Sequence, residues 1–392
     1  MKNETSVVPA GREDPSAGVA QASAATRIAS LDQFRGYTVL GMFVVNFIGY
    51  FAATPAILKH HNTYCSLADT IMPQFFFAVG FAFRMTFLRR LALQGRAGAC
   101  LRVVRRALGL VALGALLYVG GSALDAWRDA EPWPQDVPRL LLRDLFQTLV
   151  HIAVTTLWVM PVIAAGARAR IGFALGSAGL HLALSHAFYY RWVMTFPGID
   201  GGPLGFLSWT VPVLAGSLAY DLVAAGHPAR GVRRLAAWGL GLMLLGYALA
   251  CVNLVTEPNS PAPGNPGSLL VEPPLVPPTR PVNLWTMNQR AGSLSYLTFG
   301  AGLSMALYGL FVRVCDAGRF QLPVFRTLGT NALAGYVLHM VVDQLVKPFM
   351  PKDWPLVCVL AALATRKKGI SPISRNGPEG AAHKLDLSPF SA

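Results

Sequence analysis

Apolar runs of about twenty residues recur along most of the chain, and short polar segments separate them. Such a run is long enough to cross a bilayer core of about 30 Å as a helix. In lipid every backbone polar group needs a partner within the protein, so these runs are expected to be helical. The expected spans are residues 36–56, 70–88, 105–124, 145–165, 171–190, 206–225, 235–254, 292–312, 328–347 and 354–365, the last of them short. The pattern predicts an all-α fold, a polytopic integral membrane helix bundle of about 10 transmembrane helices.

The composition supports a membrane protein. Of the 392 residues, 53% are hydrophobic and only 13% are charged, whereas charged residues make up about a quarter of a typical soluble domain. These values exclude a disordered chain, a disulfide-rich secreted domain and an ordinary soluble enzyme. The cysteines are scattered, without a metal-binding spacing such as CxxC. They are Cys65, Cys100, Cys251, Cys315 and Cys358.

The spans define a transmembrane domain over residues 29–365, flanked by two polar segments. Residues 1–28 lack the apolar core of a signal peptide, so a flexible cytoplasmic tail is expected. Residues 366–392 form a polar C-terminal tail. Inside the domain, residues 255–290 carry nine prolines, which favours extended polyproline II structure. This segment is either a spacer between two spans or a lid over an outward-facing site.

The net charge is +14, and the positions of the basic residues indicate how the chain is oriented in the membrane. Arginines cluster in alternate loops, at residues 89–106, 168–170, 230–234 and 313–326. The positive-inside rule places these loops in the cytoplasm, together with both termini. The loop at 57–69 then faces outward. Membrane lipid is therefore the expected partner and nucleic acid is not, and the absence of a targeting signal favours a bacterial inner membrane.

Two adjacent histidines, His60 and His61, lie in the outward loop, and Asp69 follows them. A histidine titrates near neutral pH and is the usual residue for moving a proton off a nucleophile. Asp69 either orients a histidine ring or caps the following helix. A metal site needs three or four ligands, and no cysteine or further carboxylate joins the pair, so no metal is expected. Asn46, inside the preceding span, is a buried amide that must find partners.

The cytoplasmic start of the first span reads Ser30-Leu31-Asp32-Gln33-Phe34-Arg35-Gly36. Ser30 and Gln33 fit a helix capping box. Asp32 and Arg35 are three residues apart and are able to pair on one helical face. Two interpretations remain open: a cap with an ion pair that anchors topology, or an anion site made by an arginine and a helix N-terminus.

Polar residues also mark the later spans, where they are costly in lipid. Asn331, Tyr336 and His339 lie roughly on one face of the ninth span. Asn283 and Trp285 precede the eighth span, where the tryptophan is also typical of an interfacial anchor. A second polar stripe, Asp144 with Gln147 and His151, lies on the fourth span.

These motifs, in this order, resemble the heparan-alpha-glucosaminide N-acetyltransferase family and its bacterial relatives. The resemblance covers about residues 27–350 and is carried by the order and spacing of short motifs. They are Ser30-Leu31-Asp32, Phe34-Arg35-Gly36, Asn46, Lys59-His60, Ala68-Asp69, Pro73, Asn283 with Leu284-Trp285-Thr286, Asn331, Tyr336 and His339.

The resemblance implies acetyl transfer from cytosolic acetyl-CoA, as co-substrate, to an amino sugar or glycan across the membrane. It implies an outward-facing catalytic histidine, which falls on His60 or His61, with His60 preferred because it follows Lys59. Asp32 and Arg35 then belong to the acetyl-CoA side, and Asn46, Asn283, Trp285, Asn331, Tyr336 and His339 to the substrate side. The chain departs from the family after the histidine, where Asn62-Thr63-Tyr64-Cys65 replace the usual tryptophan and glycine.

Other functions fit the same features. An O-acyltransferase of surface polysaccharide would also have about ten spans and a histidine. In a secondary transporter, the polar stripes would line a solute path, although the repeated broken helices typical of that class are absent from the sequence. An inactive scaffold is the third alternative. A homodimer is compatible with each of them.

Overall fold

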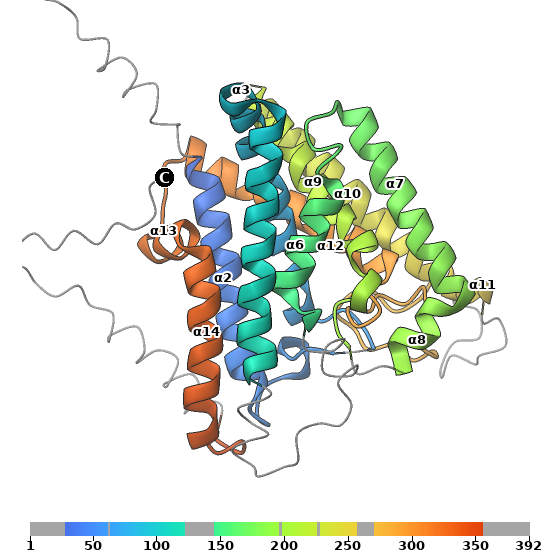
Figure 1. The fold of residues 1–392 in the computed structure, drawn as a ribbon. Coiled ribbons are helices and arrows are strands. Elements are labelled where there is room, and N and C mark those ends of the chain that lie inside the picture. The colour runs from blue at the N-terminus through green and yellow to red at the C-terminus, as the bar shows by residue number, and fades with distance from the viewer. Residues whose placement is uncertain are drawn as a thin grey trace, which may run out of the picture.

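The computed structural model describes residues 28–61, 63–121, 145–195, 198–225, 228–256 and 270–355, which are helical with connecting loops and no β-strand (Figure 1). The α-helices are α2 (Ala29–Gly49), α3 (Ile71–Gly114), α6 (Thr148–Val159), α7 (Ala167–Leu184), α8 (Tyr190–Thr195), α9 (Phe206–Ala224), α10 (Pro228–Cys251), α11 (Asn253–Thr256), α12 (Leu294–Phe311), α13 (Pro323–Thr330) and α14 (Ala332–Val346). Three π-helical segments continue them: Ala115–Val119 after α3, Ser185–Tyr189 between α7 and α8, and Val312–Ala317 after α12. Four 3-10 turns are Ala56–Leu58, Ala68–Thr70, Gly202–Leu204 and Lys347–Phe349. The prediction of an all-α fold is confirmed for these residues.

Several helices have the length and composition of membrane spans. Within the described residues, four helical segments are long and apolar enough to cross a bilayer: Ala167–Thr195, Gly202–Ala224, Ala229–Thr256 and Leu294–Ala317. Large apolar side chains are exposed on α7 and α10, among them Leu175, Trp238 and Leu244. Water-soluble monomers seldom expose extended apolar patches. The helical membrane character expected from the apolar runs is therefore present in the structure.

Helix α3 contains a reversal. At Gly95 the backbone has φ 70° and ψ −178°, which divides the helical segment into two arms. The left-handed region is open to glycine at little cost. Both ends of the hairpin, Met72 near its start and Tyr118 just after it, line one cavity, so the arms run antiparallel. Figure 1 shows the bend at the opposite end of the bundle from α8 and α11. The sequence predicted a loop over residues 89–104. These residues are instead helical on both sides of Gly95, which alone makes the turn.

Glycines set the closest helix contacts. A Cβ atom on Gly80 would lie 1.8 Å from the carbonyl oxygen of Val213, and one on Gly216 would lie 2.0 Å from that of Phe77. These reciprocal contacts bring α3 and α9 together backbone to backbone. Small residues at such contacts are typical of membrane helices, because close packing substitutes for a hydrophobic driving force.

Other boundaries also differ from the sequence prediction. Helix α2 begins at Ala29, several residues before the expected start of the first span. The ninth span is divided into α13 and α14 at Asn331, whose φ of −119° and ψ of 40° are not helical. The expected tenth span and both tails lie outside the described residues, apart from residue 28 and residues 354–355. The number of ten spans stays a prediction.

Candidate functional site

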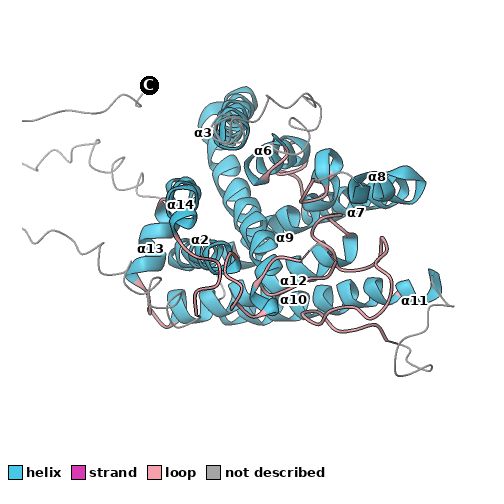
Figure 2. Cartoon of the chain, turned by 90° about the horizontal axis from the view of Figure 1, so that it is seen from below, coloured by secondary structure: helices cyan, strands magenta, loops and turns pink. Residues whose placement is uncertain are grey.

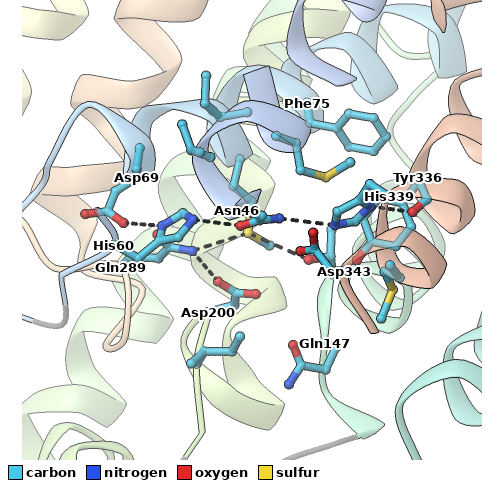
Figure 3. Close-up of a pocket in the computed structure, with 18 of the residues that line it drawn as sticks. Asn46, His60, Asp69, Phe75, Gln147, Asp200, Gln289, Tyr336, His339 and Asp343 are labelled. Carbon is cyan, nitrogen blue, oxygen red and sulfur yellow. Dashed lines mark hydrogen bonds and ion pairs between the residues drawn. The ribbon is translucent and has the colours of Figure 1, made fainter. Parts of the chain in front are cut away.

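A cavity of about 400 Å³ lies between α2, the first turns of α3, and α14. Its volume is within the range of small-molecule sites. The polar side chains on its wall come from segments far apart in the sequence, including His60, Asn46, Asp200 and His339. Figure 3 shows them converging on one space. Figure 2, a view from below Figure 1, shows connecting loops crossing that end of the bundle.

His60 is held by Asp69, which lies on the turn that precedes α3. The ring nitrogen Nδ1 is 2.7 Å from Oδ1 of Asp69. The aspartate is itself fully buried, and its other oxygen accepts hydrogen bonds from the backbone amide and the hydroxyl of Ser66, each at 2.9 Å. The His60 side chain remains 45% exposed. Asp69 therefore orients the ring of a histidine that stays accessible from the cavity.

The other ring nitrogen of His60 contacts a side chain of α2. Nε2 of His60 lies 3.2 Å from Oδ1 of Asn46, and Nδ2 of Asn46 lies 3.1 Å from Nε2 of His339. The ring of His339 in turn hydrogen-bonds through Nδ1 to the carbonyl oxygen of Tyr336. These bonds form one polar line of Asp69, His60, Asn46 and His339 (Figure 3). All four residues were singled out from the sequence, and the structure brings them together.

The neighbouring His61 makes different contacts. Its Nε2 lies 2.7 Å from the carbonyl oxygen of Ala56, and its ring stacks on Tyr64 with centroids 4.5 Å apart. Its backbone amide points to Oδ2 of Asp69 at 3.4 Å. His61 lines the cavity, but its ring is bonded to the backbone of its own loop and stacked on Tyr64. The geometry favours His60 over His61 as the chemically active histidine.

The cavity follows α2 away from the histidine loop. Its α2 lining runs from Asn46 to Thr38, and eight residues of helix correspond to about 12 Å. The hydroxyl of Thr38 donates to the backbone carbonyl of Arg35 at 2.8 Å, so the cavity ends one turn from that arginine. Apolar side chains of Met42, Ile71 and Phe75 line this stretch. The space between the two ends of α2 is partly open.

Tyr118 and Tyr336 face each other across the same cavity. Their hydroxyl groups share a hydrogen bond that joins the end of α3 to α14. Tyr336 was among the residues predicted for substrate binding, whereas Tyr118 was not singled out. It lies in an apolar run in the sequence, and nothing local in that run distinguishes it from a packing residue.

Asp200 is a second carboxylate on the cavity wall, in the loop between α8 and α9. It is only 1% exposed, and its Oδ1 accepts a hydrogen bond of 2.8 Å from Nε2 of Gln289. Burial raises its pKa to about 6. The backbone at Asp200 has φ 61°, and its carbonyl oxygen accepts a 2.7 Å hydrogen bond from Trp209. The sequence pattern singled out neither Asp200 nor Gln289 as a site residue.

Three predicted substrate residues lie outside the cavity lining. Asn283 bonds to Thr256 and to the backbone of Trp285, which organises the turn before α12. Trp285 itself is part of that turn. Asn331 is exposed at the break between α13 and α14. These residues have local structural contacts in place of contacts with the cavity.

The structure describes residues 255–256 and 270–290 of the proline-rich segment. This segment packs beside the histidine loop through a hydrogen bond of 3.0 Å from the Leu275 amide to the Cys65 carbonyl. Of its described residues, only Gln289 and Arg290 line the cavity. Residues 270–288 thus border the loop that carries His60 without covering the cavity.

The start of α2 differs from the predicted capping box. Ile28 is the N-cap residue and no side chain caps the helix. Ser30 instead contacts the hydroxyl of Tyr308, and the Gln33 amide bonds both backbone groups of Leu322. These tertiary partners replace the local cap. Asp32 and Arg35 are close enough to interact electrostatically, as their spacing predicted.

Within the described residues, no group of three or more His, Cys, Asp and Glu side chains has the arrangement of a metal site. Comparisons of the sequence with protein-family models and with curated proteins find no match.

Proposed function

We propose that the chain is a transmembrane acyltransferase. In this proposal it moves an acetyl group from cytosolic acetyl-CoA to an amino sugar or glycan on the outer side of a bacterial inner membrane. The observation that carries the proposal is the placement of His60. Asp69 orients its ring at one end of a cavity that continues along α2 to within a turn of Arg35. Ten spans and cytoplasmic termini remain part of the same proposal.

The donor end of the proposed site has suitable chemistry. Arg106 is near enough to Arg35 and Arg90 to be repelled by their charges. Cations gathered in this way favour a polyanion, because phosphate oxygens accept strong charge-assisted hydrogen bonds from guanidinium groups. The apolar stretch of cavity at Met42 and Phe75 suits the thin pantetheine arm of acetyl-CoA. The acyl group would then reach the histidine end.

The acceptor end supplies proton transfer and polar recognition. A carboxylate that holds a histidine ring orients the ring for acid or base chemistry. The amide of Asn46 and the phenol of Tyr336, which line the same cavity, are able to hydrogen-bond a carbonyl oxygen as it gains charge. His60 is proposed as the proton-transfer residue and Asp69 as the residue that positions it.

The test is thiol release by purified protein in detergent, supplied with acetyl-CoA and glucosamine. Wild type should release thiol, and His60→Ala should lose the rate by about 100-fold or more. His61→Ala, one residue away, is the matched variant and should lose much less, because its ring bonds the loop backbone.

Folding of each variant is checked by size-exclusion chromatography and thermal melting. An absence of release by folded wild type, with amino-sugar and hydroxyl acceptors alike, would refute the proposal. Equal losses in the two histidine variants would refute the assignment of His60.

A further inference from the structure

The polar line from Asp69 to Tyr336 requires a definite number of hydrogen atoms, one for each hydrogen bond in it. Its four links are Asp69 to His60, His60 to Asn46, Asn46 to His339, and His339 to the Tyr336 carbonyl. Each link needs one hydrogen between its two heavy atoms. Both ends of the line are acceptors, a carboxylate and a backbone carbonyl.

Neutral side chains do not supply enough hydrogens for these links. A neutral imidazole carries one N–H, and an amide donates only from its nitrogen, so two histidines and one asparagine bring three hydrogens to four links. All four hydrogen bonds therefore form together only when the line carries one additional proton.

The orientation of Asn46 decides where this proton resides. Its Nδ2 donates to His339, which keeps its own hydrogen on Nδ1 for the Tyr336 carbonyl. The Oδ1 of Asn46 then faces His60 and requires a donor there. His60 must also donate from Nδ1 to Asp69, whose Oδ2 already accepts from Ser66 and from the His61 amide. Asp69 is the acceptor in each of these bonds and Asn46 Oδ1 is an acceptor as well, so both ring nitrogens of His60 carry hydrogen.

A protonated histidine is an acid, so the acceptor's proton needs another base. Asp200 lies on the same cavity wall, and its carboxylate interacts with the charge of His60. Its Oδ1 accepts from Gln289, and no donor to its Oδ2 and no Lys or Arg partner occurs within the described residues. Asp200 thus contributes to the cavity wall a carboxylate whose Oδ2 accepts no hydrogen bond from another described residue. Figure 3 shows it among the same lining residues, joined to Gln289.

We propose that His60 rests as an imidazolium and acts as the acid of the reaction, while Asp200 is the base. This inference rests on the proposed acyltransferase function. The acceptor nitrogen or oxygen attacks the thioester carbonyl carbon and loses its proton to Asp200. The carbon–nitrogen or carbon–oxygen bond forms, the carbon–sulfur bond breaks, and the His60 Nε2 proton passes to the leaving sulfur. Transfer of the proton from Asp200 to His60 restores the site.

The first part of the test does not depend on activity. Protein labelled with ¹⁵N-histidine in detergent is examined by NMR at pH 7.5, and His60→Gln assigns the signals. Both nitrogens of His60 should have the shifts of protonated imidazolium, and Asn46→Leu should remove this state. His186→Gln, which alters an exposed histidine on another helix, should leave the His60 signals unchanged. A bare ring nitrogen on His60 in folded wild type would overturn the imidazolium assignment.

The second part measures thiol release with acetyl-CoA and glucosamine. Asp200→Asn should lower kcat by about 100-fold or more with little change in the KM for acetyl-CoA, and should abolish the acid limb of the pH profile near pH 6. Asp353→Asn, at an exposed carboxylate away from the cavity, should behave as wild type. Activity of Asp200→Asn within about 3-fold of wild type would overturn the base assignment. Wild type without activity would refute the proposed function and the base role together, and the NMR result would still decide the state of His60.

Discussion

The side-chain amide of Asn46 lies 3.1 Å from Nε2 of His339, which ties α2 to α14 across 293 residues of sequence. The same amide contacts His60 through its oxygen, at 3.2 Å. Asn46 is therefore the only side chain in the polar line, among the described residues, that contacts both histidines. This placement makes Asn46 the residue whose loss should separate the loop from the bundle.

Replacement of Asn46 by leucine should remove both contacts at once and leave two ring nitrogens without their partner. We expect thiol release to fall by about 100-fold and the free energy of unfolding to fall by about 1–3 kcal/mol. Asn331→Leu is the matched control, because Asn331 is exposed and outside the cavity lining. Rates and melting temperatures of both variants check the expectation. A loss of activity in Asn331→Leu as large as that in Asn46→Leu would contradict the placement of the site.

Replacement of Asp200 by asparagine should stabilise the fold at neutral pH. Burial raises the pKa of Asp200 from 3.8 to about 6, so the folded protein favours the protonated form. The stability this provides is present below pH 4 and is lost as the pH rises through 6. The variant has no such loss, so it should be more stable by on the order of 3 kcal/mol at pH 7.5.

This gain should shrink toward zero at pH 4, where wild type is also uncharged at this position. Denaturant unfolding in detergent at the two pH values measures the difference. A stability gain that is equal at both pH values would show that the charge of Asp200 is not its cause.

The apolar periodicity was sufficient to predict a helical membrane fold, because the backbone requirement in lipid leaves few alternatives. It did not predict the helical path through residues 89–104, because arginines there suggested a loop. Leucine, alanine, glutamine and arginine are strong helix formers, and a single left-handed glycine at Gly95 makes the turn. The capping box failed for a similar reason, since Ser30 and Gln33 have distant partners that no local pattern contains.

The candidate site was predictable where one residue type had an unusual environment. His60, Asp69 and Asn46 were polar groups at or inside a span, and the structure brings them together. Asp200 was not singled out because it precedes Gly201 and Gly202 and is typical of an ordinary turn. Asn283 and Asn331 have the same polar character as Asn46, and only the three-dimensional path of the chain separates them from the cavity.

Gly216→Ala should destabilise the contact between α3 and α9. The new Cβ atom would lie 2.0 Å from the carbonyl oxygen of Phe77, so the two backbones must separate. We expect a loss of about 3 kcal/mol. Gly172→Ala is the matched control, because nothing lies within 4 Å of its added Cβ and alanine favours the helix. Melting temperatures should therefore fall for the first variant and stay level or rise for the second. A fall of equal size in both would contradict the packing explanation.

Asp221→Asn should weaken the contacts that join α9 to α3 and α7. Asp221 on α9 accepts a 2.6 Å hydrogen bond from Nε of Arg84 and also pairs with Arg170. Arg170 is fully buried, whereas the sequence placed it in a cytoplasmic loop; its buried position is explained by Asp221 and by the 2.9 Å bond to Ser217. Loss of the carboxylate leaves two guanidinium groups without their counter-charge. We expect a loss of on the order of 2 kcal/mol, reduced from the value for a fully buried pair because Asp221 is 34% exposed.

Chemical unfolding in detergent checks this value, with Asp353→Asn as a control that removes an exposed carboxylate. The cavity lies elsewhere, so thiol release per folded molecule should not change in Asp221→Asn. A reduced rate at unchanged stability would instead connect the arginine pair to the reaction, because a purely structural ion pair alters the amount of folded protein and not its turnover.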